Sequence, residues 1–136
     1  MSDKVKALIE TLYDGLKRMD VDAVVSLFDA DVEIQTPTSL PWSAGHYTGL
    51  DGAVSYFTGA LAMLEENRFE VQEVRVSGED WAAALGMWYG RFRDSGGVFN
   101  VRFVHFWTLR DDRIIRGEGM SDTDGIVRAL HGQAAT

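Results

Sequence analysis

The sequence predicts an α+β fold, in which helices come first and consecutive antiparallel strands follow. Apolar residues recur at helical spacing in three segments of the first half, 2–19, 23–28 and 49–64. Four strand-like segments then follow one another through short turns, at 69–77, 81–93, 99–109 and 113–120. Strands joined in this way form an antiparallel sheet, and helices packed over one face of a curved sheet leave a cavity between them.

The first helix is expected to begin near Ser2 or Asp3, either of which can cap it, and to bury one apolar stripe. This stripe consists of Val5, Leu8, Ile9, Leu12, Leu16 and Met19. Asp20-Val21-Asp22 separates it from a short second helix that reaches Phe28. A strand over 32–36 ends at Pro37, which has no N–H for a sheet, and a loop runs to Tyr47.

The third helix opens at 49–52, with Asp51 as its cap, and ends at 65–67. In the strand that follows, the alternation slips near Glu73, which predicts a bulge. Turns are expected at 78–80, 94–97 and 110–112. A last helix contains Ile126, Val127 and Leu130, is capped by Ser121 or Asp122, and leaves a frayed tail over 132–136.

Composition limits the classes of partner. A chain of 136 residues fits one domain, 1–136, with a single core. Its formal net charge of −8 disfavours nucleic acid and anionic membrane surfaces as partners. No apolar run approaches the roughly 20 residues of a membrane helix. The start of the chain lacks a signal-peptide core, and there is no cysteine. We expect a cytoplasmic protein that binds neither nucleic acid nor membrane.

The strand 99–109 carries the residue that most needs explaining. Side chains alternate along a strand, so one face carries Phe99, Val101, Phe103, His105, Trp107 and Leu109. His105 is the one polar residue on this face, and its imidazole needs a partner. A carboxylate, a water or a ligand could supply it. The alternative is a core histidine bonded to a backbone carbonyl or to water.

Three further residues each allow two structural interpretations. Trp42 and His46 lie on the loop 37–47, where side chains can line the mouth of a pocket. Trp42 could equally plug the edge of the core, and His46 could be an ordinary loop residue. Tyr13 lies beside the apolar stripe of the first helix, with its hydroxyl either in water or aimed into a pocket.

Several segments together resemble one known family. They are DAVVSLF at 22–28, DVEI at 31–34, the loop 42–49, RFVHFWTLRD at 102–111 and DT at 122–123. With these segments the chain resembles the SnoaL-like polyketide cyclases, in the superfamily of nuclear transport factor 2 and ketosteroid isomerase. The resemblance implies a cone-shaped, cystatin-like fold, with helices on a curved antiparallel sheet and an internal pocket.

The resemblance also implies a site. His105 falls where cyclase-like members place a pocket histidine, and these members pair it with an acid on the last strand. Glu118 is the nearest acid here, although a shift of one residue would put Gly119 in its place. Tyr13 falls near the helix tyrosine of the isomerases. The base of the isomerases would fall near Thr36, which cannot act as one, so steroid isomerisation is disfavoured.

We therefore expect a catalytic group of His105, Glu118 and Tyr13 beside an apolar pocket. The expected pocket residues are Trp42, His46, Phe28, Phe57, Trp88, Phe103 and Trp107. Such a site would bind a small hydrophobic molecule and act as an acid–base isomerase or cyclase next to a carbonyl, without a cofactor. No metal is expected, because the three histidines lack ligand spacing.

A noncatalytic ligand-binding module and a dimerisation scaffold are the alternatives. The resemblance implies a homodimer formed through the outer face of the sheet. Val104, Phe106, Trp88 and Phe92 would suit that interface, although periodicity alone leaves open whether Trp88 faces the pocket or a partner.

Overall fold

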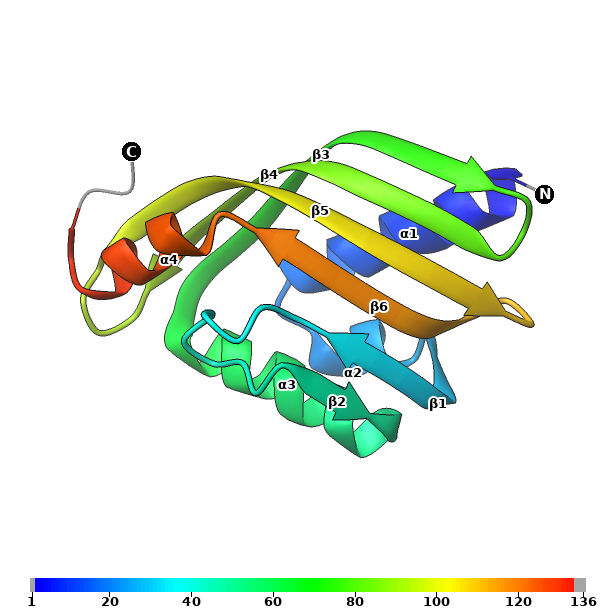
Figure 1. Cartoon of the computed structure of the whole chain (residues 1–136), viewed down its shortest axis with the longest axis horizontal. Helices are drawn as coiled ribbons and strands as arrows, with labels where there is room; N and C mark the ends of the chain where they lie inside the picture. Colours follow the sequence, from blue (N-terminus) through cyan, green and yellow to red (C-terminus); the bar gives the residue numbers. More distant parts are fainter. Residues whose placement is uncertain (1, 134–136) are drawn as a thin grey trace.

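The chain folds into a six-stranded sheet with helices packed on it (Figure 1). The computed structural model describes residues 2–133. The helices are α1 (Ser2–Lys17), α2 (Val21–Val25), α3 (Gly49–Met63) and α4 (Thr123–Leu130). The strands are β1 (Phe28–Gln35), β2 (His46–Thr48), β3 (Leu64–Ser77), β4 (Trp81–Phe92), β5 (Val98–Arg110) and β6 (Arg113–Ser121). The predicted α+β class is confirmed.

The strands lie in the order β2-β1-β6-β5-β4-β3. Neighbouring strands are antiparallel, as predicted, except that β1 pairs with β6 in parallel. The chain between these two strands contains α3 and four further strands, a connection long enough to return it in the same direction. The expectation of a purely antiparallel sheet is therefore wrong at this one junction.

The helices cover the sheet unequally. In Figure 1, α1, α2 and α3 lie behind the sheet, while α4 lies at the end where β5 begins. Helix α1 contacts β3, α3 contacts β1, and α2 lies between α1 and α3. The side chains buried most completely come from all these layers: Ile9, Leu12, Phe28, Leu64, Phe92, Phe99, Ile114 and Ile126. The core therefore lies between this helical layer and the inner face of the sheet.

Two predicted helix ends are wrong, each because a strand begins earlier than its alternation suggests. Phe28 is the first residue of β1, where it pairs with Ile114 and its ring contacts Phe57. Helix α3 ends at Met63, so that residues 65–67 belong to β3. The short strand β2 lies in the predicted loop, where its three residues hydrogen-bond to the end of β1.

The predicted bulge is present, and a glycine makes room for it. The register of β3 and β4 shifts between Val71 and Glu73. A Cβ atom on Gly86 would lie 2.0 Å from the carbonyl oxygen of Glu70, so only glycine fits across from the bulge.

At the carboxyl end, the backbone N–H groups of Gly132 and Gln133 donate to carbonyls in the last turn of α4. The remainder of the predicted frayed tail, 134–136, lies outside the described residues. Within residues 2–133, no helix is both long and apolar enough to cross a membrane.

Candidate functional site

Strand β5 directs His105 toward the helices, as the alternation predicts. Its neighbours on the same face, from Phe99 to Leu109, are buried. The outer face of β5 carries exposed Asn100 and Arg102. His105 thus lies on an apolar wall inside the protein.

The partner of His105 is Tyr13, a member of the predicted catalytic group, although the sequence did not predict a bond between the two. The Tyr13 hydroxyl lies 2.7 Å from Nδ1 of His105, and the indole N–H of Trp107 donates to the same hydroxyl over 3.2 Å. A tyrosine hydroxyl has a single proton, so it can accept from Trp107 and donate to Nδ1. A neutral His105 then carries its own proton on Nε2. The opposite tautomer would leave a buried hydroxyl proton without an acceptor, which costs about 1–3 kcal/mol.

Burial keeps both groups uncharged. Desolvation lowers the pKa of His105 to about 3. It also raises the pKa of Tyr13 far above its ordinary value, and the hydrogen bond that Tyr13 accepts from Trp107 opposes this rise only in part. At neutral pH the site therefore holds a neutral imidazole and a neutral phenol.

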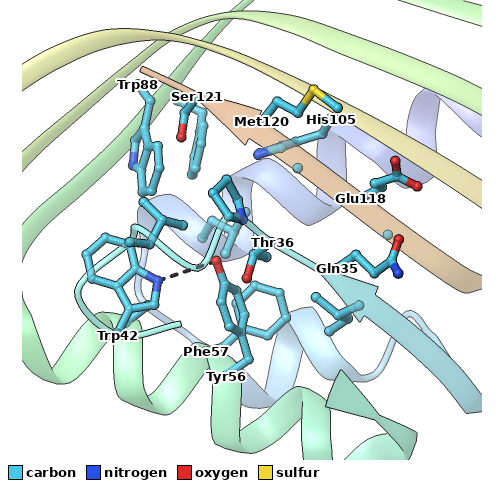
Figure 2. Close-up of a pocket in the computed structure, with 18 of the residues that line it drawn as sticks. Gln35, Thr36, Trp42, Tyr56, Phe57, Trp88, His105, Glu118, Met120 and Ser121 are labelled. Atoms are coloured by element: carbon cyan, nitrogen blue, oxygen red, sulfur yellow. Dashed lines mark hydrogen bonds between the residues drawn. The ribbon is translucent and has the colours of Figure 1, made fainter. Parts of the chain in front are cut away.

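His105 lines a pocket between the helices and the sheet (Figure 2). Its Nε2 makes no hydrogen bond with the described residues, and no fully buried polar side-chain atom among residues 2–133 lacks a partner. Nε2 therefore reaches the open space of the pocket, where it presents an N–H donor. The cavity has a volume of about 70 Å³, measured as the space open to the centre of a water molecule.

The pocket wall is mostly apolar, with a few polar groups. Its aromatic residues are Trp42, Phe57, Phe69, Trp88 and Trp107. The polar side chains among its lining residues include those of Thr36, Tyr56, Asn67, His105 and Ser121. Such a wall suits a ligand that is largely apolar and carries a small number of polar atoms.

The lining reaches the surface where β1 and β6 separate. Their pairing ends at Gln35 and Glu118, and Pro37, without an N–H, cannot continue it. Strand β6 extends to Ser121 and pairs there with β5 alone. Met120, which is 54% exposed, lies beside this opening.

The predicted pair of His105 and Glu118 does not form. His105 lies opposite Gly119 on β6, and Glu118 lies opposite Phe106, so the side chain of Glu118 is on the outer face. Although Glu118 borders the pocket, its carboxylate lies 3.4 Å from Arg116 and points away from the cavity in Figure 2. Gly119 makes room for the imidazole, since a Cβ there would lie 3.1 Å from Cδ2 of His105.

The other predicted residues divide into three groups. Those that line the pocket are Trp42, Phe57, Trp88 and Trp107. Phe28, Phe103 and Tyr13 are buried and are not part of its lining. His46 is exposed on β2, 3.3 Å from Glu33, and its placement in the pocket is wrong.

Asn67 is a pocket residue that the sequence analysis missed. It is 6% exposed, accepts from the indole N–H of Trp88 over 2.7 Å, and donates to the carbonyl of Leu16 over 3.2 Å. Asn67 shares a face with Phe69 and Val71, so a polar residue on an apolar face was the available signal. Assigning 65–67 to a helix end concealed it.

Comparison with known proteins agrees with this architecture. The SnoaL-like domain family matches residues 9–117. No curated protein sequence matches the chain. A nuclear transport factor 2-like protein of unknown function from Burkholderia pseudomallei has a similar structure, with 23% identity, a TM-score of 0.84, and coverage of 96% of this chain and 98% of its own.

Two further structures are similar. TerC, co-crystallised with polyporic acid, has 23% identity and a TM-score of 0.81, covering 94% of this chain and 98% of its own. A candidate SnoaL-like polyketide cyclase from Jannaschia has 17% identity and a TM-score of 0.79, covering 95% and 92%. These likenesses confirm the nuclear transport factor 2-like fold. The family match covers more than half of the sequence, and the chain belongs to the SnoaL-like domain family.

Proposed function

We propose that this chain binds a small, largely apolar carbonyl compound and holds its carbonyl oxygen with the Nε2–H of a neutral His105. The hydrogen-bond chain from Trp107 through Tyr13 to Nδ1 is the observation that carries this proposal, because it keeps the donor proton on the pocket side. Tyr13 is then a positioning residue, since it holds His105 without lining the pocket.

The geometry supports a cofactor-independent isomerase or cyclase that acts next to the carbonyl. A donor fixed in a dry site stabilises the negative charge that develops on oxygen when an adjacent C–H bond loses its proton. Because burial lowers the pKa of His105 to about 3, the imidazole is a weak base and serves as the donor. TerC was co-crystallised with polyporic acid, which supports a small organic ligand for this fold.

A noncatalytic binding module is the second candidate. The orientation of Glu118 favours it, because the one acid expected to act with His105 points to the outer face. Deuterium exchange at the carbons beside the carbonyl of bound cyclohexanone distinguishes the two functions. A catalyst accelerates the exchange relative to the H105F variant, whereas a binder does not.

The binding proposal predicts a preference for a ketone over a hydrocarbon of the same shape. NMR titrations that follow the indole N–H signals of Trp88 and Trp107 can compare cyclohexanone with methylenecyclohexane. His105→Phe is expected to weaken cyclohexanone binding about 2–10-fold, because one neutral hydrogen bond is lost. Binding of methylenecyclohexane should stay within twofold of the wild type.

Glu118→Gln is the matched control for this experiment, because it changes an acid near the pocket whose carboxylate faces outward. It should leave both affinities unchanged. If His105→Phe leaves cyclohexanone binding unchanged, His105 is not the donor and the proposal fails.

We also propose that the chain forms a homodimer through the outer face of the sheet. Trp81 and Phe106 stack on this face with ring centroids 6.0 Å apart, next to half-buried Val104. Trp88 and Phe92 take no part, because both are buried on the inner side.

Light scattering tests this proposal. The wild type should have the mass of a dimer, and Phe106→Asp should reduce it to that of a monomer because a charge at the interface is costly to bury. Asn100→Asp, at an exposed position on the same face of β5, is the control and should stay dimeric. A monomeric wild type contradicts the proposal.

Three other expectations belong with this proposal. A donor-assisted reaction at a carbonyl needs neither cofactor nor metal. The net charge of −8 favours a small-molecule partner over nucleic acid or an anionic membrane. A sequence without cysteine suits the cytoplasm as the compartment.

A further inference from the structure

The pocket has a second polar end, formed by hydroxyl groups away from His105. Thr36, just after β1, and Tyr56, on α3, both line the same pocket as His105 (Figure 2). Ser43, on the loop between β1 and β2, lies next to Thr36 with their hydroxyl oxygens 2.5 Å apart. The Tyr56 hydroxyl accepts a hydrogen bond from the indole N–H of Trp42 over 3.4 Å.

The Tyr56 hydroxyl has a proton that none of the described residues accepts. Its bond with Trp42 uses the oxygen as the acceptor, because an indole N–H can only donate. The hydroxyls of Thr36 and Ser43 bond to each other, and the backbone N–H of Gly45 donates to the Ser43 oxygen over 3.0 Å. The proton of Tyr56 is therefore left for a partner in the pocket.

Tyr56 lines the pocket, so this proton can point into it. Burial raises the pKa of Tyr56 to about 12, so this hydroxyl keeps its proton at neutral pH. A ligand oxygen would be its natural acceptor.

We infer that the pocket recognises a small apolar molecule with two acceptor oxygens, such as a dicarbonyl compound, one held by His105 and the other by Tyr56. This inference rests on the proposed function for the first oxygen and adds the second. The carbon skeleton between the two oxygens lies against Trp42, Phe57 and Trp88, which line the same cavity. The two donors therefore select for the number of ligand oxygens as well as for an apolar skeleton.

Matched probes with one or two carbonyl groups test the inference on the full chain. Cyclohexane-1,4-dione is compared with cyclohexanone, and 1,4-diacetylbenzene with acetophenone, so that two oxygen spacings are covered. At least one dicarbonyl should bind more tightly than its monocarbonyl partner. Tyr56→Phe should weaken binding of that dicarbonyl about 2–10-fold, because one neutral hydrogen bond is lost, and leave the monocarbonyl unchanged.

A second measurement and a control protect the test against effects on folding. The affinity of the Tyr56→Phe variant for the monocarbonyl shows whether its pocket is intact. Tyr47→Phe is the control, because the Tyr47 hydroxyl bonds to the backbone of Ala44 and Trp42 and Tyr47 is not among the pocket residues. It should keep the preference intact.

The outcomes separate the two proposals. Equal affinities for monocarbonyl and dicarbonyl probes, or a Tyr56→Phe variant that weakens both alike, would overturn the inference and leave the role of His105 standing. If His105→Phe changes no affinity, the proposed function fails. A dicarbonyl preference that depends on Tyr56 supports the second oxygen site in either case.

Discussion

Lowering the pH from 7.5 to 5.0 is expected to reduce the free energy of unfolding by about 2 kcal/mol, with His105 as the main cause. Burial lowers the pKa of His105 from 6.5 to about 3 in the folded protein. Between these two values the unfolded chain binds one more proton than the folded chain. Stability is therefore complete above pH 6.5 and is lost progressively as the pH falls toward 3.

Urea unfolding at a series of pH values measures this loss. The His105→Phe variant should show little change between pH 7.5 and 5.0, since most carboxylates titrate below this range. His46→Gln is the control, because His46 is exposed on β2, and it should keep the wild-type pH dependence. A wild type equally stable at both pH values would show that His105 is protonated in the fold.

Tyr13→Phe is expected to destabilise the protein by about 2–4 kcal/mol. The substitution keeps the ring and its contacts with Phe69 and Phe103 but removes the hydroxyl. Nδ1 of His105 then loses a donor, and the indole N–H of Trp107 loses its acceptor. Both groups lie inside the protein, where a polar group without a partner costs about 1–3 kcal/mol.

Urea unfolding at pH 7.5 gives this value, and the cyclohexanone titration gives its functional counterpart. Tyr89→Phe is a suitable control, because Tyr89 is on the outer face, where its ring lies 4.7 Å from the Arg68 guanidinium. That variant should change stability by less than about 0.5 kcal/mol. A loss below about 1 kcal/mol for Tyr13→Phe would mean that the hydroxyl does not serve both partners.

Most of the fold could be predicted from the sequence, because the spacing of apolar residues indicates which side chains of each helix and strand are buried. The alternation from Phe99 to Leu109 correctly places His105 on the inner face of a central strand. The parallel junction of β1 with β6 was not accessible, because it joins strands far apart in the chain and leaves no local pattern.

The site was only partly accessible, since it depends on register and on contacts between distant elements. A shift of one residue turns every side chain of a strand to the other face. The sequence did not determine this register, which places Gly119 and not Glu118 opposite His105. Tyr13 and His105 belong to α1 and β5, so the sequence could suggest each residue but not their bond. Tyr56 was not predicted at all, because its place in the pocket depends on the packing of its ring against Tyr47 and Phe57.

Side-chain ¹⁵N NMR of His105, recorded between pH 5 and 8, tests the central claim most directly. The His105→Phe spectrum identifies its signals. We predict a proton on Nε2, an unprotonated Nδ1, and no titration across this range, because Tyr13 donates to Nδ1 and burial excludes the charged form. A proton on Nδ1, or a titration midpoint near 6.5, would contradict the neutral donor on which the proposed function rests.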